Sequence, residues 1–201
     1  MKVIIVTGGI GSGKSIACDY LHSHYGWPVY EADVRVKELY GTHPTLLSDI
    51  EKALGTGLRN DDGGLNPQAL ADIIFQDVDA LIRVESFVFP ALTDDFRNWK
   101  KAHADCEQVI LESATILEKP QLEGIGDFIL LIDAPMHLRL SRATDRDGAS
   151  EEKVLMRMAK QKMMNNISSG VITAPADLVI LNDGTVENFK EKLDEFVKKV
   201  L

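Results

Sequence analysis

The chain has 201 residues, 45% of them hydrophobic and 26% charged, which is ordinary for a globular protein with one well-buried core. Its formal net charge of −9 argues against general binding to nucleic acid or to anionic membranes. No apolar run approaches the roughly 20 residues of a membrane span, and glycines interrupt the apolar start too early for a signal peptide. We therefore expect a cytoplasmic protein. Its two cysteines, Cys18 and Cys106, lack metal-binding spacing and are expected to be structural.

The first part of the chain combines a strand, a glycine-rich loop and a helix. Residues 2–7 are a β-branched run typical of a strand buried on both faces, and residues 16–25 have helical spacing. Between them, residues 8–15 match G-x-x-x-x-G-K-[ST], the phosphate-binding loop. Glycines let backbone N–H groups approach phosphate oxygens, and the start of the helix adds the positive end of its dipole. This order of elements predicts a nucleoside triphosphate site.

Individual loop residues have expected roles at that site. Lys14 is expected to reach the β- and γ-phosphates, and the Ser15 hydroxyl is expected to hold Mg²⁺. The alternative, a glycine-rich turn that binds nothing, leaves unexplained why a Lys and a Ser both lie in register with the motif. The residues expected to bind ATP here are Gly9, Gly11, Ser12, Gly13, Lys14, Ser15 and Ile16.

Two acidic residues follow a second expected strand. That strand covers residues 27–30, Glu31 and Asp33 come next, and a helix is expected over residues 34–40. Acidic side chains at the carboxyl end of a strand in an open α/β sheet lie where ligands bind. Asp33 fits two roles equally well, as the N-cap of the following helix or as a catalytic base.

The middle of the chain is expected to be helical. Residues 55–64 form a polar, glycine-rich loop that predicts a boundary. The helices that follow have no strand between them, which predicts an insertion beside the sheet, about residues 60–105. This insertion could hold a second substrate or serve only packing. Its helices are expected over residues 67–74, 78–88 and 91–104, the last two separated by Pro90.

Strands are expected again in the second half of the chain, at residues 108–111, 128–132 and 176–181. A last helix with an apolar stripe follows Thr185. Strands that alternate with helices predict an α/β fold with a doubly wound parallel sheet.

A basic segment lies between the last two expected strands. Residues 137–162 carry seven Lys and Arg against four Asp and Glu, and Arg142 and Arg146 lie four apart on an expected helix that ends before Gly148. This arrangement fits a lid, about residues 142–162, whose guanidinium groups neutralise a transferring phosphoryl group. It also fits a solvated helical face. The sequence has no N-K-x-D guanine signature, which argues against a GTPase switch. The basic segment favours a small-molecule kinase.

Together these features resemble the dephospho-CoA kinase family along nearly the whole chain. No single motif carries the resemblance, since many kinases share the glycine loop. The matching stretches are residues 7–15, 31–33, 112–118 (ESATILE), 133–135 and 142–148 (the R-x-x-x-R-D-G run), Gln161, and residues 176–177 with 182–184.

The resemblance implies ATP-dependent phosphorylation of the ribose 3′-hydroxyl of dephospho-CoA, the last step of coenzyme A biosynthesis. It implies one P-loop kinase domain, residues 1–201, with a five-stranded parallel core, a helical CoA-side insertion and a lid. Asp33 is then the general base, Arg142 and Arg146 contact ATP, and Asn182 lies near the adenine. The substrate-binding residues implied are Glu31, Asp33, Phe89, Pro90 and Glu118.

Two positions depart from the family pattern. Glu31 stands where the family has Asp, and Phe89 stands where it often has His, which removes a hydrogen-bonding side chain. Neither change touches the nucleotide loop or Asp33, so we expect an active enzyme whose acceptor site differs in detail. The alternatives are a kinase of another small hydroxylated acceptor, such as a nucleoside or nucleotide, and a non-catalytic ATP-sensing module. The oligomeric state stays open.

Overall fold

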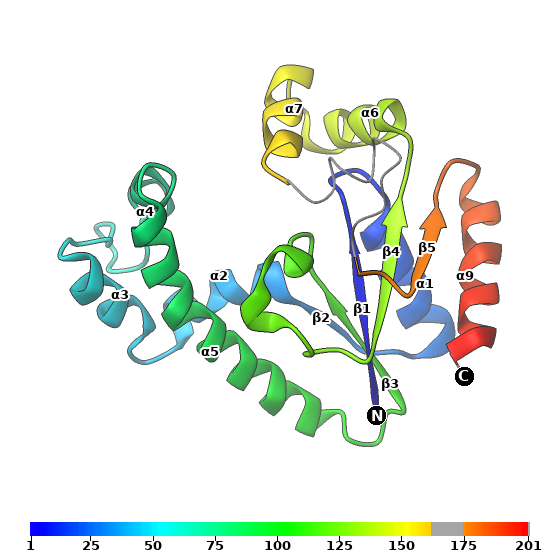
Figure 1. Cartoon of the computed structure of the whole chain (residues 1–201), viewed down its shortest axis with the longest axis horizontal. Coiled ribbons are helices and arrows are strands. Elements are labelled where there is room, and N and C mark those ends of the chain that lie inside the picture. The colour runs from blue at the N-terminus through cyan, green and yellow to red at the C-terminus, as the bar shows by residue number, and fades with distance from the viewer. Residues whose placement is uncertain (162–174, 201) are drawn as a thin grey trace. The chain divides into compact units, whose positions relative to one another are not determined.

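The computed structural model describes residues 1–161 and 175–200 of the chain (Figure 1). These residues form two compact units. The first consists of Met1–Glu31 and His103–Leu201, and the second of Ala32–Ala102. None of the helices in the described part of the chain is long and apolar enough to cross a bilayer.

The first unit contains a five-stranded sheet in which all neighbouring strands are parallel, in the order β2-β3-β1-β4-β5. The predicted doubly wound parallel sheet is therefore confirmed. Strands β2 and β3 are added on one side of β1 and strands β4 and β5 on the other, so the carboxyl end of β1 is the switch point where such sheets bind ligands. The strands are β1 (Lys2–Gly8), β2 (Val29–Glu31), β3 (Gln108–Glu112), β4 (Phe128–Asp133) and β5 (Leu178–Leu181).

The central strand β1 is buried along nearly its whole length, as its β-branched sequence predicts. One face of the sheet is covered by α1 (Lys14–Tyr25) and α9 (Val186–Val200), which also pack against each other. On the other face, Leu131 packs against Leu117, Ala176 and Val179. The core beneath α1 and α9 includes Ile4, Val6, Leu21, Trp27, Ile110, Leu130, Ile132, Phe189, Leu193 and Phe196.

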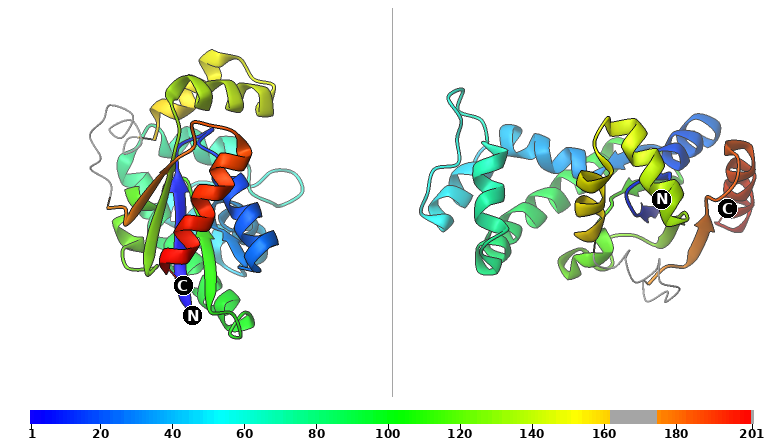
Figure 2. Two further views of the ribbon diagram at one scale, coloured as in Figure 1. Left: turned by 90° about the vertical axis from the view of Figure 1, so that its right-hand side faces the viewer. Right: turned by 90° about the horizontal axis from the view of Figure 1, so that it is seen from above.

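Two helices of the first unit lie beyond the carboxyl ends of the strands (Figure 2). They are α6 (Met136–Asp147), which directly follows β4, and α7 (Glu151–Ala159). Gly148 separates them in the left-handed conformation, with φ 57°, and the Ser150 hydroxyl caps α7 by accepting a hydrogen bond from Lys153 N–H. Two short 3₁₀ turns, η1 (Ile116–Glu118) and η2 (Pro120–Leu122), connect β3 to β4.

The second unit is entirely helical apart from one short bridge. It consists of α2 (Ala32–Thr42), α3 (Leu46–Leu54), α4 (Pro67–Ile74) and α5 (Val78–Ala102), and α5 packs against the other three. The unit begins at Ala32, earlier than the insertion of about residues 60–105 that the sequence indicated.

The expected break at Pro90 is wrong, because α5 runs without interruption from Val78 to Ala102 with Pro90 inside it. A proline removes one helical hydrogen bond and strains the preceding turn. Apolar residues on both sides of Pro90 are buried along one face of α5, and this packing keeps the helix continuous. They are Val84, Val88, Ala91, Leu92 and Phe96.

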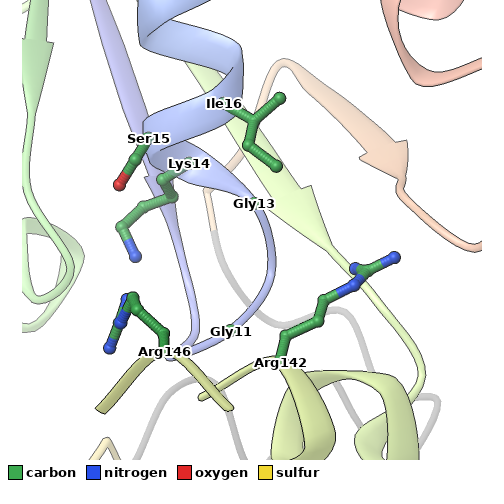
Figure 3. Close-up of a pocket in the computed structure, with 7 residues that line it drawn as sticks. All are labelled: Gly11, Gly13, Lys14, Ser15, Ile16, Arg142 and Arg146. Atoms are coloured by element: carbon green, nitrogen blue, oxygen red, sulfur yellow. The ribbon is translucent and has the colours of Figure 1, made fainter. Parts of the chain in front are cut away.

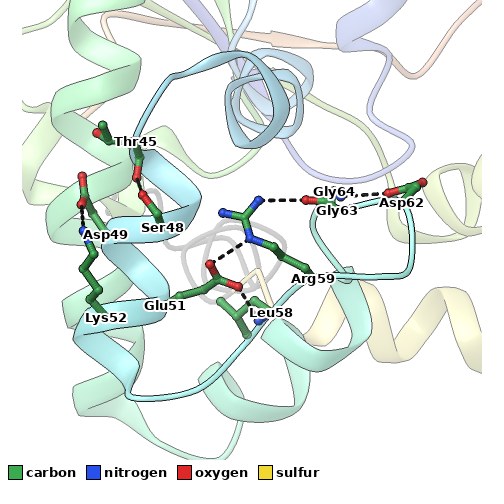
Figure 4. A network of polar contacts seen from close by, with 10 residues as sticks. All are labelled: Thr45, Ser48, Asp49, Glu51, Lys52, Leu58, Arg59, Asp62, Gly63 and Gly64. Atoms are coloured by element: carbon green, nitrogen blue, oxygen red, sulfur yellow. Dashed lines mark hydrogen bonds and ion pairs between the residues drawn. The ribbon is translucent and has the colours of Figure 1, made fainter.

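Residues 55–64, which the sequence indicated as a boundary, lie inside the second unit. Glu51 of α3 holds this loop with both carboxylate oxygens: Oε1 accepts from Leu58 N–H at 2.9 Å and Oε2 from Arg59 Nε at 3.0 Å (Figure 4). Arg59 Nη1 in turn donates to the Gly63 carbonyl at 2.9 Å, and an antiparallel bridge pairs Arg59 with Leu65. The loop is therefore a hydrogen-bonded hairpin within the second unit and not a boundary between units.

Replacing Glu51 with Ala should lower the free energy of unfolding by about 1–2 kcal/mol, because Leu58 N–H and the Arg59 guanidinium lose their shared acceptor. The hydrogen bond from Leu58 N–H, together with that from Arg59, lowers the pKa of Glu51. The stabilisation by ionised Glu51 is thus complete above the pKa of Glu51 in the unfolded chain, about 4.3. It is lost as the pH falls through the lowered pKa of Glu51 in the folded protein. Urea unfolding at pH 7 and at lower pH measures it. Lys52→Ala, at an exposed neighbour, is the control, and equal midpoints for the two variants would contradict the assignment.

Candidate active site

The glycine loop joins β1 to α1 at the switch point of the sheet. Gly11 and Gly13 have φ values of 75° and 107°, which side chains with a Cβ rarely adopt. Space forbids a side chain as well: a Cβ on Gly11 would lie 2.1 Å from the Arg139 carbonyl oxygen, and one on Gly13 would lie 2.3 Å from Asn182 Nδ2. The conformation of the loop is therefore fixed by its surroundings as much as by its own glycines.

Helix α1 begins at Lys14, immediately after this loop. The first N–H groups of a helix have no partner within it and carry the positive end of the dipole, so the backbone of residues 14–16 offers donors to an anion. Lys14 Nζ donates to the Gly8 carbonyl at 2.9 Å and lies 3.9 Å from Glu112 Oε1. The Lys14 side chain thus folds back along the glycine loop, and its ammonium group lies near Glu112.

The loop forms one wall of a pocket of about 290 Å³. The opposite wall comes from α6, which contributes Arg142 and Arg146 (Figure 3). A volume of this order suits part of a small ligand. Three cationic side chains in one pocket of a chain with net charge −9 favour a strongly anionic ligand such as a triphosphate. The lining residues are Gly11, Gly13, Lys14, Ser15, Ile16, Arg142 and Arg146.

Both arginines are held by neighbours in the first unit. Arg142 Nη1 donates to the Asn182 carbonyl at 3.1 Å. Arg146 donates through Nε and Nη2 to both oxygens of Asp147, and Arg157 of α7 also donates to Asp147. The hydrogen bonds from Arg146 and then Arg157 hold the pKa of Asp147 well below its usual range, so this carboxylate stays ionised and links the end of α6 to α7.

A second pocket of about 230 Å³ lies on the other side of Ser15. Glu31 and Glu112 both line it, and the two are register partners on the neighbouring strands β2 and β3. Carboxylates beside a hydroxyl are hard oxygen ligands of the kind that Mg²⁺ prefers, and this ion usually takes only one or two protein carboxylates together with phosphates and water. The donor set therefore fits Mg²⁺. Within residues 1–161 and 175–200, no group of three or more His, Cys, Asp or Glu could hold a metal without such additional ligands.

Cys18 also lines the second pocket, but burial raises the pKa of its thiol, and Glu112 adds to that effect. A thiol that stays protonated is a poor nucleophile and a poor metal ligand. Both Cys18 and Cys106 are free, and Cys18 is buried.

The predicted ATP-binding residues of the first unit lie together. Five of the loop residues line the first pocket with both arginines, while Ser12 is buried behind the loop, where its carbonyl accepts from Asn182 Nδ2 at 2.9 Å. Asn182 is itself buried, so its visible function is to support the loop. Glu118 ends η1 and lines neither of the two pockets described above.

The remaining predicted residues belong to the second unit. Asp33 lies in the first turn of α2, because this helix begins at Ala32 and not at residue 34 as expected. A carboxylate there interacts favourably with the positive end of the helix dipole. Phe89 and Pro90 lie in the middle of α5, where Phe89 is half-buried and Pro90 exposed. The roles expected for these three residues stay predictions.

Sequence reasoning missed the burial of Arg139. In the sequence, Arg139 is only one of the seven basic residues of 137–162, but it is 1% exposed, whereas Arg142 and Arg146 of the same helix line the pocket. The available signal was spacing: Arg139 lies four residues before Ala143 and therefore on the same, buried face of α6. The pairing of Glu112 with Glu31 was also missed, because strand order is not visible in the sequence.

A glycine loop at the central switch point, a lysine at the start of the following helix, and arginines facing it across a pocket are the recurring parts of phosphoryl-transfer sites. The fold and the site thus define a P-loop kinase. The family described as Dephospho-CoA kinase matches residues 2–188 of the chain. The chain belongs to this family.

Individual relatives agree with that assignment. The dephospho-CoA kinase of Porphyromonas gingivalis is 34% identical over 184 residues, which cover 90% of this chain and 86% of the relative. The dephospho-CoA kinase of Bacteroides fragilis is 33% identical over 180 residues, covering 89% and 83%. Among solved structures, TT1252 from Thermus thermophilus has a TM-score of 0.78 at 28% identity, covering 100% of this chain and 98% of that one. Dephospho-CoA kinase from Campylobacter jejuni shares the fold, with a TM-score of 0.66 at 20% identity and coverage of 98% and 96%.

Gly11→Ala should abolish ATP binding, because the new methyl group meets the backbone carbonyl of Arg139 and the loop must change shape. Gly55→Ala is a matched control: its φ of 69° resembles the 75° of Gly11, but nothing lies within 4 Å of the added Cβ. Both variants should lose roughly 1–2 kcal/mol of stability from the left-handed backbone. Calorimetric titration with ATP distinguishes them, and normal affinity in Gly11→Ala would show that the contact with Arg139 is dispensable.

Proposed function

We infer that this protein transfers the γ-phosphoryl group of ATP to the ribose 3′-hydroxyl of dephospho-CoA, giving coenzyme A and ADP in the last step of coenzyme A biosynthesis. The observation that carries this conclusion is the pocket in which Lys14, Arg142 and Arg146 face the glycine loop, in a chain that belongs to the dephospho-CoA kinase family. We also propose a cytoplasmic location, in keeping with the two free cysteines.

The glycine loop binds the phosphates of ATP in this proposal. The N–H groups at the start of α1 donate to phosphate oxygens, and Lys14 exchanges the Gly8 carbonyl for the β- and γ-phosphates. Arg142 and Arg146 neutralise the charge that spreads over the transferring group. Because the helix N–H groups and both arginines already line the pocket before ATP arrives, little reorganisation of these groups accompanies the transition state.

Mg²⁺ is proposed to bind between the two pockets. Ser15 lines both of them and supplies the hydroxyl, and Glu31 and Glu112 are the carboxylates that can hold the ion or its water molecules. When bound, the ion supplies charge neutralisation on the phosphate oxygens. The extra methylene of Glu31, compared with the family's Asp, lengthens its reach into this position.

Asp33 is proposed as the general base that accepts the proton of the attacking hydroxyl. Its first-turn position on α2, with an exposed side chain, supports access to a substrate. We propose that the acceptor substrate contacts Glu31, Phe89, Pro90 and Glu118. The CoA-side unit is proposed to be residues 32–102. The lid is proposed over about residues 142–162, whose final residue lies outside the described part of the chain.

A single assay tests the proposed reaction. The protein is incubated with ATP, Mg²⁺ and, separately, dephospho-CoA, nucleosides or nucleotides, and the products are weighed by mass spectrometry. The expected result is coenzyme A from dephospho-CoA and no product from the other acceptors. Turnover of another acceptor alone would establish a different kinase, and ATP binding without any product would establish an ATP-sensing module.

Asp33→Asn should lower kcat by about 10²-fold or more while leaving the Kd of ATP largely unchanged, because general-base catalysis contributes on this scale. Asp79→Asn is the matched control, since Asp79 is also an acid in the first turn of a helix of the second unit, α5. Steady-state kinetics with dephospho-CoA and titration with ATP provide the two readouts. A near-normal kcat in Asp33→Asn would refute the base assignment.

Arg146→Met should lower kcat by at least about 10²-fold, because a guanidinium that stabilises the transferring phosphoryl group contributes strongly to the transition state. Lys199→Met removes one positive charge from the exposed last turn of α9, outside the proposed lid, and serves as the control. If both variants lose the same small factor, Arg146 contributes only to the general electrostatic field. The measurement is kcat at saturating ATP and acceptor.

A further inference from the structure

Ile10, at the tip of the glycine loop, contacts the α6–α7 segment through its carbonyl, its N–H and its side chain. The Ile10 carbonyl accepts a hydrogen bond from Arg139 Nε at 3.1 Å. The Ile10 N–H donates to Gln161 Oε1 at 2.9 Å. The Ile10 side chain packs against the cluster of Ala143, Val154 and Met158. We call this set of contacts the Ile10 joint.

The two polar partners come from opposite ends of the same segment. Arg139 lies in the first half of α6, and Gln161 lies two residues after the end of α7. Both are buried, at 1% and 5% exposure, so neither side chain is a solvated surface group. The helix pair is therefore fastened to the loop where it begins and where it ends, and its apolar interior closes over Ile10 in between.

Further contacts fix the orientation of each partner. Arg139 Nη1 lies 3.8 Å from Asp133 Oδ1 at the end of β4, which compensates part of the desolvation of a buried guanidinium. Gln161 Nε2 donates to the Ala114 carbonyl at 3.5 Å, just beyond β3. The joint thus connects the loop to the ends of the strands on either side of β1.

The Ile10 joint connects the two walls of the first pocket. One wall is the loop, and the other is formed by Arg142 and Arg146. These residues follow Arg139 by about one and two helical turns, so fixing Arg139 against Ile10 fixes where they stand relative to Lys14. A site whose donors are held in place before the ligand arrives binds more tightly than one that must order them on binding.

We propose that Arg139 and Gln161 are positioning residues for ATP. They hold the arginines of α6 at the correct distance from the glycine loop without contacting the nucleotide. The proposal rests on the function proposed above for this pocket, and it predicts that ATP affinity depends on two side chains that solvent barely reaches.

The test uses the full chain with Arg139→Met, Gln161→Met and the double variant. Each substitution keeps a long apolar side chain and removes a hydrogen bond to Ile10. The Kd of ATP, measured by calorimetry without acceptor, should rise about 10-fold in each single variant. The double variant should lose clearly less than the product of the two factors, because both side chains hold the same residue. Lys199→Met and Gln76→Met, at exposed positions outside the proposed lid, are the matched controls and should bind ATP like the wild type.

Kinetics distinguish positioning from a general loss of structure. The KM for ATP should rise and kcat should fall, while the KM for dephospho-CoA stays within about twofold of the wild-type value. In Gln161→Met, amide hydrogen exchange at Ile10 should accelerate, since its N–H loses its acceptor. Arg139→Lys keeps a buried cation with a donor and should recover part of the affinity lost in Arg139→Met; it also provides the test if the Met variant does not fold.

ATP affinities within twofold of wild type in folded Arg139→Met, Arg139→Lys and Gln161→Met would overturn the proposal. A wild-type protein that binds ATP but makes no coenzyme A would instead overturn the proposed function. In that case the ATP titrations and the exchange rate of Ile10 still decide the role of the joint, so the two failures are distinguishable.

Discussion

The site depends on the close approach of the glycine loop to the side chains and backbone behind it. Between Gly9 and Gly13 the chain passes so near to Arg139 and Asn182 that a methyl group cannot be inserted at the glycines. The curvature that presents N–H groups to an anion is therefore imposed from outside the loop, by α6 and by the residue that follows β5. A glycine-rich sequence in isolation would be free to adopt many shapes, and the loss of that freedom occurs when the protein folds rather than when the ligand binds.

Two adjacent pockets of the first unit have linings of opposite charge. A chain with net charge −9 places Lys14, Arg142 and Arg146 around one pocket and Glu31 with Glu112 around the next, and Ser15 belongs to both. The first arrangement suits phosphate oxygens, and the second suits a cation that accompanies them. Lys14 Nζ lies between the two, 3.9 Å from Glu112. The charge of the lining side chains thus changes sign from one pocket to the next, with Ser15 shared between them.

Much of the fold could be predicted because its signals are local. Three of these signals can each be recognised within a short stretch of sequence, and the structure contains all three: the β-branched run of β1, the glycine motif and the amphipathic stripe of α9. The predictions that failed concern competition between local preference and packing. Pro90 predicts a break in the helix because proline lacks an N–H group, yet packing of the buried face keeps α5 continuous. The composition of the polar loop at residues 55–64 indicates a boundary, yet Glu51 and Arg59 hold this loop inside the second unit.

The sequence by itself determined the chemistry of the nucleotide site, because the order of glycines, lysine and hydroxyl in a strand–loop–helix segment is complete within the first sixteen residues. Its likeness to one kinase family also followed from motifs that can be read along the chain. Only the tertiary structure decided how that site is supported. Arg139 and Gln161 lie more than a hundred residues from Ile10, and their burial against it depends on strand order and helix packing, which no local pattern encodes. Residue types specify which atoms can bind a phosphate, but long-range packing specifies where those atoms are held.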